Sequence, residues 1–151
     1  LLADLDGDGR ADLILVAWRE NGNAHSYERF TFYRHGTEGE EHWQLVPFFN
    51  ARDSGEEDSL RTLHGADCDL RSVIVLRKKH DSPVTIIVGD RDLGESFADP
   101  AKVTFVVYTL TRNDEGLAGW PLVYFKVSAT IQGKSLHCDI HEAFASELGI
   151  H

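Results

Sequence analysis

The sequence contains no methionine, only four prolines and two cysteines, and no long apolar run. No stretch approaches the roughly 18 apolar residues that a membrane-spanning helix requires, so we expect no such helix. The missing methionine and an opening that already has the pattern of a folded element indicate a processed or trimmed chain. The lack of a targeting segment is therefore uninformative.

Positive charge is scarce in this sequence. The chain has 15 Lys and Arg against 25 Asp and Glu, a net charge of −10. Such a surface repels nucleic acid and anionic lipid, and it suits a small molecule or a basic protein as partner. Solubility is an equally sufficient reason for the charge. With 151 residues and 42% hydrophobic content, the chain fits one globular domain, residues 1–151.

The apolar segments are short, rich in β-branched and aromatic residues, and separated by turn residues. This pattern is typical of a mainly β protein. We predict a buried strand over 11–18, an alternating strand over 28–33, a returning strand over 43–49, and a polar acidic loop over 50–60. Two hairpins should follow, formed by 72–76 with 84–88 and by 102–111 with 120–130.

One helix is predicted, at the C-terminal end. Asp139 can cap it, Glu142 completes a capping box, and Gly149 ends it. Ile140, Phe144 and Leu148 then share one face. The fold class predicted is a single antiparallel β-sandwich or half-open barrel with a C-terminal helix.

The strongest motif is an acidic loop near the start of the chain. It carries carboxylates at alternate positions, then a glycine, a residue that offers its carbonyl, and a closing carboxylate. Calcium takes 6–8 oxygen ligands, and a tight loop can turn such groups inward. The ligands predicted are Asp4, Asp6, Asp8, the Arg10 carbonyl and Asp12.

This loop is not an EF-hand, because Leu15 stands where an EF-hand has its bidentate Glu. Magnesium fits less well than calcium, since it demands stricter octahedral geometry. The alternative to a metal is a solvated acidic turn. Because the loop leads into a strongly apolar segment, we expect Ca²⁺ to have a structural role.

The two cysteines, Cys68 and Cys138, each precede an aspartate. A disulfide between them would close a loop of 70 residues and stabilise the fold by about 4 kcal/mol on the chain-entropy model. Two buried free thiols are the alternative. The sequence leaves both open.

Motifs of known catalytic chemistry are missing. There is no G-x-S-x-G turn, and no serine is followed by lysine three positions later. His141 and Glu142 begin a zincin-like helix, but Ala145 stands where the second histidine is needed. His137 and His141 lack a third zinc ligand nearby. We therefore predict a protein that is not an enzyme.

An acidic segment between two predicted strands is a second candidate site. It contains Asp90, Arg91, Asp92, Glu95 and Asp99. These residues could form a ligand or partner loop. The alternative is a network of Arg91 with its carboxylates that only fixes a wide loop.

Several segments together resemble the carbapenem self-resistance (CarG-like) protein family over almost the whole chain. They are Asp4-Leu5-Asp6-Gly7-Asp8-Gly9 with Asp12-Leu13-Ile14, Cys68-Asp69-Leu70-Arg71, Asp90-Arg91 with Phe97-Ala98-Asp99-Pro100, Gly119-Trp120-Pro121, and Cys138-Asp139 with Glu142-Ala143-Phe144 and Glu147-Leu148-Gly149. The resemblance implies a periplasmic or secreted protein that protects against a carbapenem antibiotic by binding, without hydrolysis.

A weaker resemblance is to calcium-loop proteins related to the periplasmic i-type lysozyme inhibitors. It implies an inhibitor or immunity protein that blocks a lysozyme with a protruding loop, here 53–56 or 90–99. An acidic inhibitor suits a basic lysozyme. An unrecognised hydrolase is the second alternative, and the sequence leaves monomer and homodimer open.

Overall fold

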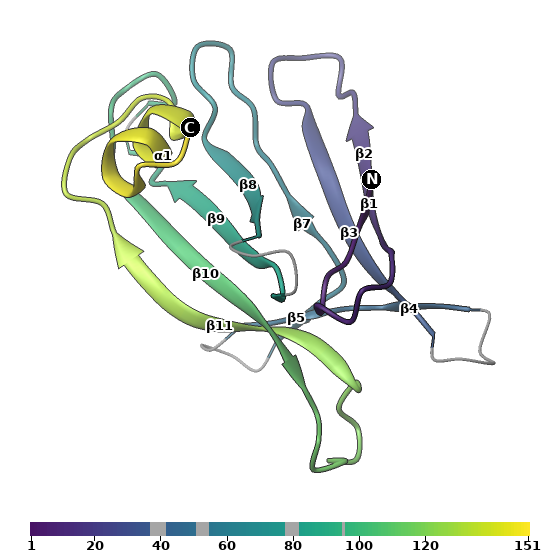
Figure 1. The fold of residues 1–151 in the computed structure, drawn as a ribbon. Coiled ribbons are helices and arrows are strands. Elements are labelled where there is room, and N and C mark those ends of the chain that lie inside the picture. The colour runs from purple at the N-terminus through teal and green to yellow at the C-terminus, as the bar shows by residue number, and fades with distance from the viewer. Residues whose placement is uncertain (37–41, 51–54, 78–81, 95) are drawn as a thin grey trace.

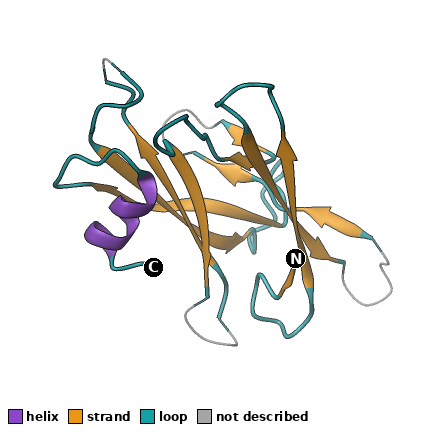
Figure 2. Cartoon of the chain, turned by 90° about the horizontal axis from the view of Figure 1, so that it is seen from above, coloured by secondary structure: helices purple, strands orange, loops and turns teal. Residues whose placement is uncertain are grey.

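The computed structural model describes residues 1–36, 42–50, 55–77, 82–94 and 96–151. Two β-sheets, one of them a half-barrel, carry a single helix near the C-terminus (Figures 1 and 2). The predicted fold class is therefore confirmed. No helix in the described ranges is long and apolar enough to cross a membrane.

The first sheet is built around two long antiparallel strands. Its members are β1 (Leu2–Ala3), β2 (Asp12–Arg19), β3 (Tyr27–His35), β4 (Trp43–Leu45) and β7 (Leu60–Arg61), of which β7 pairs with β3. The strand predicted over 11–18 is present as β2, but the prediction that it is buried is wrong, because Leu15, Val16 and Trp18 are exposed. The strand extends past the core, and β1 pairs only with Asp12 and Leu13 at its start.

The second sheet contains both predicted hairpins. In spatial order its strands are β6 (Glu56–Glu57), β5 (Phe48–Phe49), β11 (Val123–Gln132), β10 (Val103–Arg112), β9 (Thr85–Arg91) and β8 (Arg71–Leu76). The single strand predicted over 43–49 is instead divided between the sheets. Pro47, which has no N–H to donate, separates β4 from β5. The segment 50–60, predicted to be a loop, contains the short strand β6 and the first residue of β7. Residues 51–54 lie outside the described ranges.

The main core lies between the two sheets. Phe32 of β3, Phe48 of β5 and Phe125 of β11 are fully buried, with ring centroids 4.8–5.4 Å apart. Burying rings of this size gives the largest share of apolar stabilisation per residue. These three phenylalanines join strands of both sheets across the sandwich.

A second apolar cluster joins the helix α1 (Ile140–Leu148) to the half-barrel. The side chain of Asp139 accepts the His141 N–H, and Gly149 ends the helix in a left-handed conformation with φ 67°, as predicted. Ile140 and Phe144 are buried against β9 and β10, opposite Gly89. A Cβ at Gly89 would lie 2.9 Å from both side chains, so this glycine permits the close approach.

Candidate functional site

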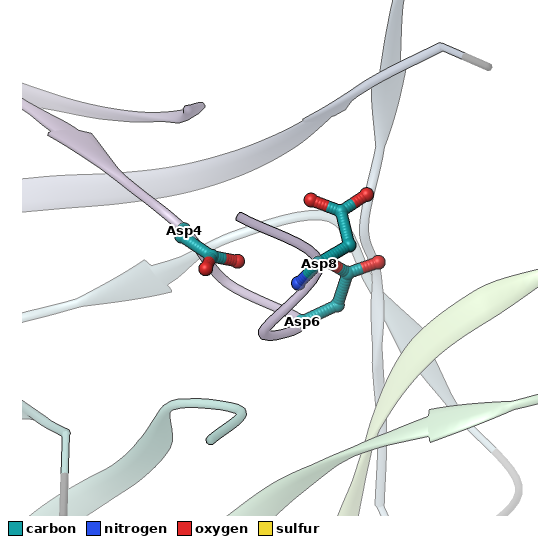
Figure 3. Close-up of side chains that lie close together, drawn as sticks. All are labelled: Asp4, Asp6 and Asp8. Carbon is teal, nitrogen blue, oxygen red and sulfur yellow. The ribbon is translucent and has the colours of Figure 1, made fainter. Parts of the chain in front are cut away.

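The acidic loop brings three carboxylates close together (Figure 3). Ligand oxygens of Asp4, Asp6 and Asp8 all lie within 4.8 Å of one another. The loop connects β1 to β2, so it stands at the margin of the first sheet. The alternation seen in the sequence thus brings one ligand oxygen from each of the three side chains together around a tight turn.

Local hydrogen bonds explain why the chain folds into this turn. Asp4 accepts the N–H groups of Gly7 at 2.7 Å and Gly9 at 3.1 Å. Both glycines have positive φ, 81° and 83°, which other residues adopt only with strain. Asp8 accepts the Arg10 N–H at 2.8 Å. The aspartates therefore serve as backbone acceptors as well as candidate ligands.

Two arginines that the sequence analysis missed reach the loop from different sheets. Oδ2 of Asp6 accepts Nε of Arg34 on β3 at 2.9 Å and a terminal nitrogen of Arg112 on β10 at 2.7 Å. The Asp6 side chain is only 2% exposed. A terminal nitrogen of Arg34 also lies 3.9 Å from Asp8. Asp6 thus links the two sheets, and the arginines offset part of the loop's negative charge.

Asp12 lies outside the group of three carboxylates. Its two oxygens accept the N–H groups of Leu5 at 2.8 Å and His35 at 2.9 Å. Burial raises its pKa above the usual aspartate value, against the opposing effect of these two hydrogen bonds. In this structure Asp12 therefore fastens the base of the loop to β3 instead of facing the other aspartates. The Arg10 guanidinium donates to Gly36, and the carbonyl role of Arg10 stays a prediction.

The donor set suits a hard divalent cation. Two ligands of one calcium ion are separated by at most about 5 Å, twice the Ca–O distance, and the three carboxylates meet that condition. Their oxygens are the ligand type that calcium prefers. Asp4, Asp6 and Asp8 are the residues that would hold the ion.

The two cysteines lie at the other end of the molecule. Cys68 and Cys138 are at disulfide distance, with Cα atoms 5.6 Å apart. Cys68 is buried at 5% exposure. Hydrogen bonds parallel the link: the Asp69 N–H donates to Asp139 at 3.0 Å, and the Ile140 N–H donates to the Asp69 carbonyl at 2.9 Å. The pairing that the sequence left open is therefore favoured over two separate thiols.

The 90–99 segment is organised by a buried arginine. Arg91 is 2% exposed and donates to the carbonyl oxygens of Phe97 and Asp99, each at 2.6 Å. The network of Arg91 with its carboxylates, considered from the sequence, is replaced by a clamp on backbone carbonyls. Asp90 pairs with Arg71 at 3.4 Å, and Asp92 and Asp99 are exposed. Glu95 lies outside the described residues.

A row of hydroxyl, imidazole and carboxylate groups also escaped the sequence analysis. Thr62 Oγ1 lies 3.1 Å from His64 Nε2, and His64 Nδ1 lies 2.8 Å from Asp69. Nucleophile triads have this order of groups. Thr62 is only 3% exposed, however, and its hydroxyl accepts the Glu28 N–H at 2.8 Å. No motif marks this row in the sequence, because the three residues are brought together by the turn before β8.

Comparison with known proteins gives one strong structural likeness. No family model matches the sequence, and no curated protein matches it. A crystal structure of CarG superimposes with a TM-score of 0.77 at 19% sequence identity, covering 96% of this chain and 89% of that chain. At this identity the likeness concerns the fold alone. The chain has a CarG-like fold along nearly its entire length.

Proposed function

We propose that this chain is a periplasmic or secreted, non-enzymatic binding protein that protects against a small molecule of the carbapenem class. The observation that carries the proposal is the CarG-like fold over 96% of the chain. It agrees with the sequence segments that resemble carbapenem self-resistance proteins. A rigid β scaffold with exposed loops is a common arrangement for a binding surface.

Calcium has a structural role in this proposal. Asp4, Asp6 and Asp8 hold one Ca²⁺ ion, which neutralises carboxylates that would otherwise repel one another. The loop lies between β1 and β2 and is tied to both sheets through Asp6. An ion at this position would fasten the start of the chain to the sandwich.

The extracytoplasmic location is supported by the cysteine pair. Disulfides persist in oxidising compartments and are rare in the cytosol. Cys68 and Cys138 lie at disulfide distance in a position that joins a loop to the helix. Oxidation of this pair would be stable in the periplasm or outside the cell.

The test separates binding from turnover. The protein is incubated with a molar excess of a carbapenem and, separately, with basic lysozymes, and the remaining antibiotic and lysozyme activity are measured over time. We expect saturable, stoichiometric binding of the carbapenem without multiple turnovers. Loss of antibiotic beyond one equivalent would overturn the non-enzymatic claim. Stoichiometric inhibition of a lysozyme would move the assignment to an inhibitor.

A hydrolase is the second candidate, because Thr62, His64 and Asp69 stand in triad order. It is weaker, since the Thr62 hydroxyl is buried and already accepts a backbone N–H. Thr62→Val removes the hydroxyl, and His64→Gln removes the base. If turnover is found and both variants abolish it, the row is catalytic. Turnover that survives both variants would exclude it.

A further inference from the structure

A pocket of about 530 Å³ lies where β3, β6, β7 and β8 come together. Figure 1 shows β7 between β3 and β8, at the junction of the two sheets. The lining residues are Arg29, Glu57, Asp58, Ser59, Arg61 and Arg71. Three arginines around one pocket are unexpected in a protein with a net charge of −10.

Two of these arginines stand directly opposite each other. Arg29 of β3 and Arg61 of β7 are cross-strand partners, so their side chains leave the same face of the sheet. Like charges in this position are destabilising. In the part of the chain that the structure describes, no carboxylate forms an ion pair with either one. Arg29 donates to Ser59 at 2.9 Å, and the Arg61 guanidinium lies 5.9 Å from the Tyr27 ring centroid.

The third arginine of the pocket, Arg71 on β8, is held by an ion pair. Arg71 pairs with Asp90 at 3.4 Å, which uses one of its terminal nitrogens. Its Nε is buried and has no hydrogen-bond partner among the described residues. An arginine has five N–H donors in a fixed fork, so each of the three retains donor capacity.

Tyr27, next to the pocket, is also surrounded by arginine side chains. Arg19 donates to the Tyr27 hydroxyl at 3.0 Å and lies 5.7 Å from its ring centroid. Hydrogen bonding from Arg19, with a contribution from Arg29, lowers the Tyr27 pKa below its usual range. The positive charge therefore extends from the pocket onto the adjoining face of β2 and β3.

We propose that this pocket binds the oxyanion group, carboxylate or phosphate, of a small molecule. Guanidinium groups match such planar or tetrahedral oxyanions with paired N–H donors. An anion between Arg29 and Arg61 would relieve their mutual repulsion. Glu57 and Asp58 also line the pocket and repel polyanions, so the site suits one oxyanion on a compact ligand. This pocket would be the part of the proposed binding protein that contacts its ligand. The identity of the natural ligand rests on the proposed function.

The experiment titrates ¹⁵N-labelled protein with inorganic phosphate and, separately, with acetate at constant ionic strength. Shifts should saturate and concentrate at Tyr27, Ser59 and Arg71. Arg61→Gln, an exposed position, should weaken binding about tenfold, the loss of roughly one charge-assisted hydrogen bond. Lys134→Gln is the matched control: it removes one positive charge at an exposed residue beyond the end of β11 and should leave affinity unchanged.

Three results would overturn the site: shifts that do not saturate, shifts spread over the whole surface, or equal weakening in both variants. Circular dichroism of both variants checks that they are folded. The tighter of the two probes indicates whether the natural ligand offers phosphate or carboxylate. If the protein does not bind phosphate or carboxylate at this pocket, the proposed protective function is unaffected. If the protein instead turns over a carbapenem, that function is rejected and the anion site is unaffected.

Discussion

The acidic loop and the helix end of the molecule fasten the chain by opposite means. At the acidic loop, Asp6 links β3 and β10 through two arginines. At the helix end, Cys68 and Cys138 lie at disulfide distance, and Phe144 packs into an apolar cluster on β9 and β10. The first region depends on charge, and the second on burial and on a cysteine pair placed to form a covalent link.

This difference determines what each region responds to. Ion pairs and a bound cation are sensitive to chelators, salt and acid. A disulfide and an apolar contact are largely insensitive to these but respond to reductant and to changes of volume. Variants at the two ends should therefore lose stability under different conditions, and the predictions below test that separation.

The largest effect is expected from the cysteines. Replacing Cys68 and Cys138 together by serine removes a link between positions 70 residues apart, which should cost about 4 kcal/mol of unfolding free energy on the chain-entropy model. Urea denaturation of both proteins measures the loss. The calcium response of the double variant should be unchanged. Equal urea midpoints would show that the pair is not bonded in the native protein.

Asp6→Asn should have the next largest effect, even in the presence of a chelator. The Arg34 side chain is 7% exposed, and removal of its closest carboxylate leaves a buried charge with only Asp8, 3.9 Å away, beside it, a change that costs about 3 kcal/mol. Arg112→Gln is the matched control, because the Arg112 side chain is 45% exposed and should cost less than about 1 kcal/mol. Urea denaturation in chelator compares the two. Equal losses would contradict the role given to burial.

The strands and helix could be predicted because their signals are local. Alternation in 28–33, the Asp139 cap and the Gly149 stop all act within a few residues. The interruption at Pro47 was missed because an apolar run on both sides of a single proline still has the pattern of one strand. The exposure of Leu15 and Val16 was missed because it depends on how far neighbouring strands extend.

The candidate site was predictable only in part, for the same reason. Asp4, Asp6 and Asp8 are close in sequence, and their spacing indicated that they converge. The arginines that bind Asp6 are 28 and 106 positions away, so no local pattern connects them to it. Arg29, Arg61 and Arg71 likewise meet only through strand pairing, and a composition of net −10 gives no sign of them.

Calcium should stabilise the acidic-loop end without affecting the helix end. An ion that binds only the folded loop adds about 2.7 kcal/mol when its concentration is 100 times the dissociation constant. Asp8→Asn should abolish this gain while costing little in chelator, because the Asp8 side chain is 31% exposed and 3.9 Å from Arg34. Thermal unfolding with calcium and with chelator measures it. Identical melting temperatures for the unaltered protein would reject the metal site.

The smallest effect belongs to Glu147, at the helix end. Its Oε1 accepts the N–H groups of Ser135 at 2.8 Å and Lys134 at 3.0 Å, and it lies 3.2 Å from His137 Nε2. These hydrogen bonds, from Ser135 first, lower the Glu147 pKa from 4.5 to about 2. A carboxylate with a lowered folded-state pKa stabilises the protein above its unfolded pKa, and this contribution is lost as the pH falls through the folded value.

Glu147→Gln should therefore be less stable than the unaltered protein above pH 4.5, and the two should converge as the pH falls toward about 2. Urea midpoints measured across this range in chelator follow the difference. Glu115→Gln removes the same charge from an exposed loop residue without these three contacts and serves as the control. A gap between Glu147→Gln and the unaltered protein that stays constant down to the lowest pH would show that the Glu147 carboxylate gains nothing from its contacts with residues 134–137. The pH dependence of stability in acid would then arise at other carboxylates, among them those of the acidic loop.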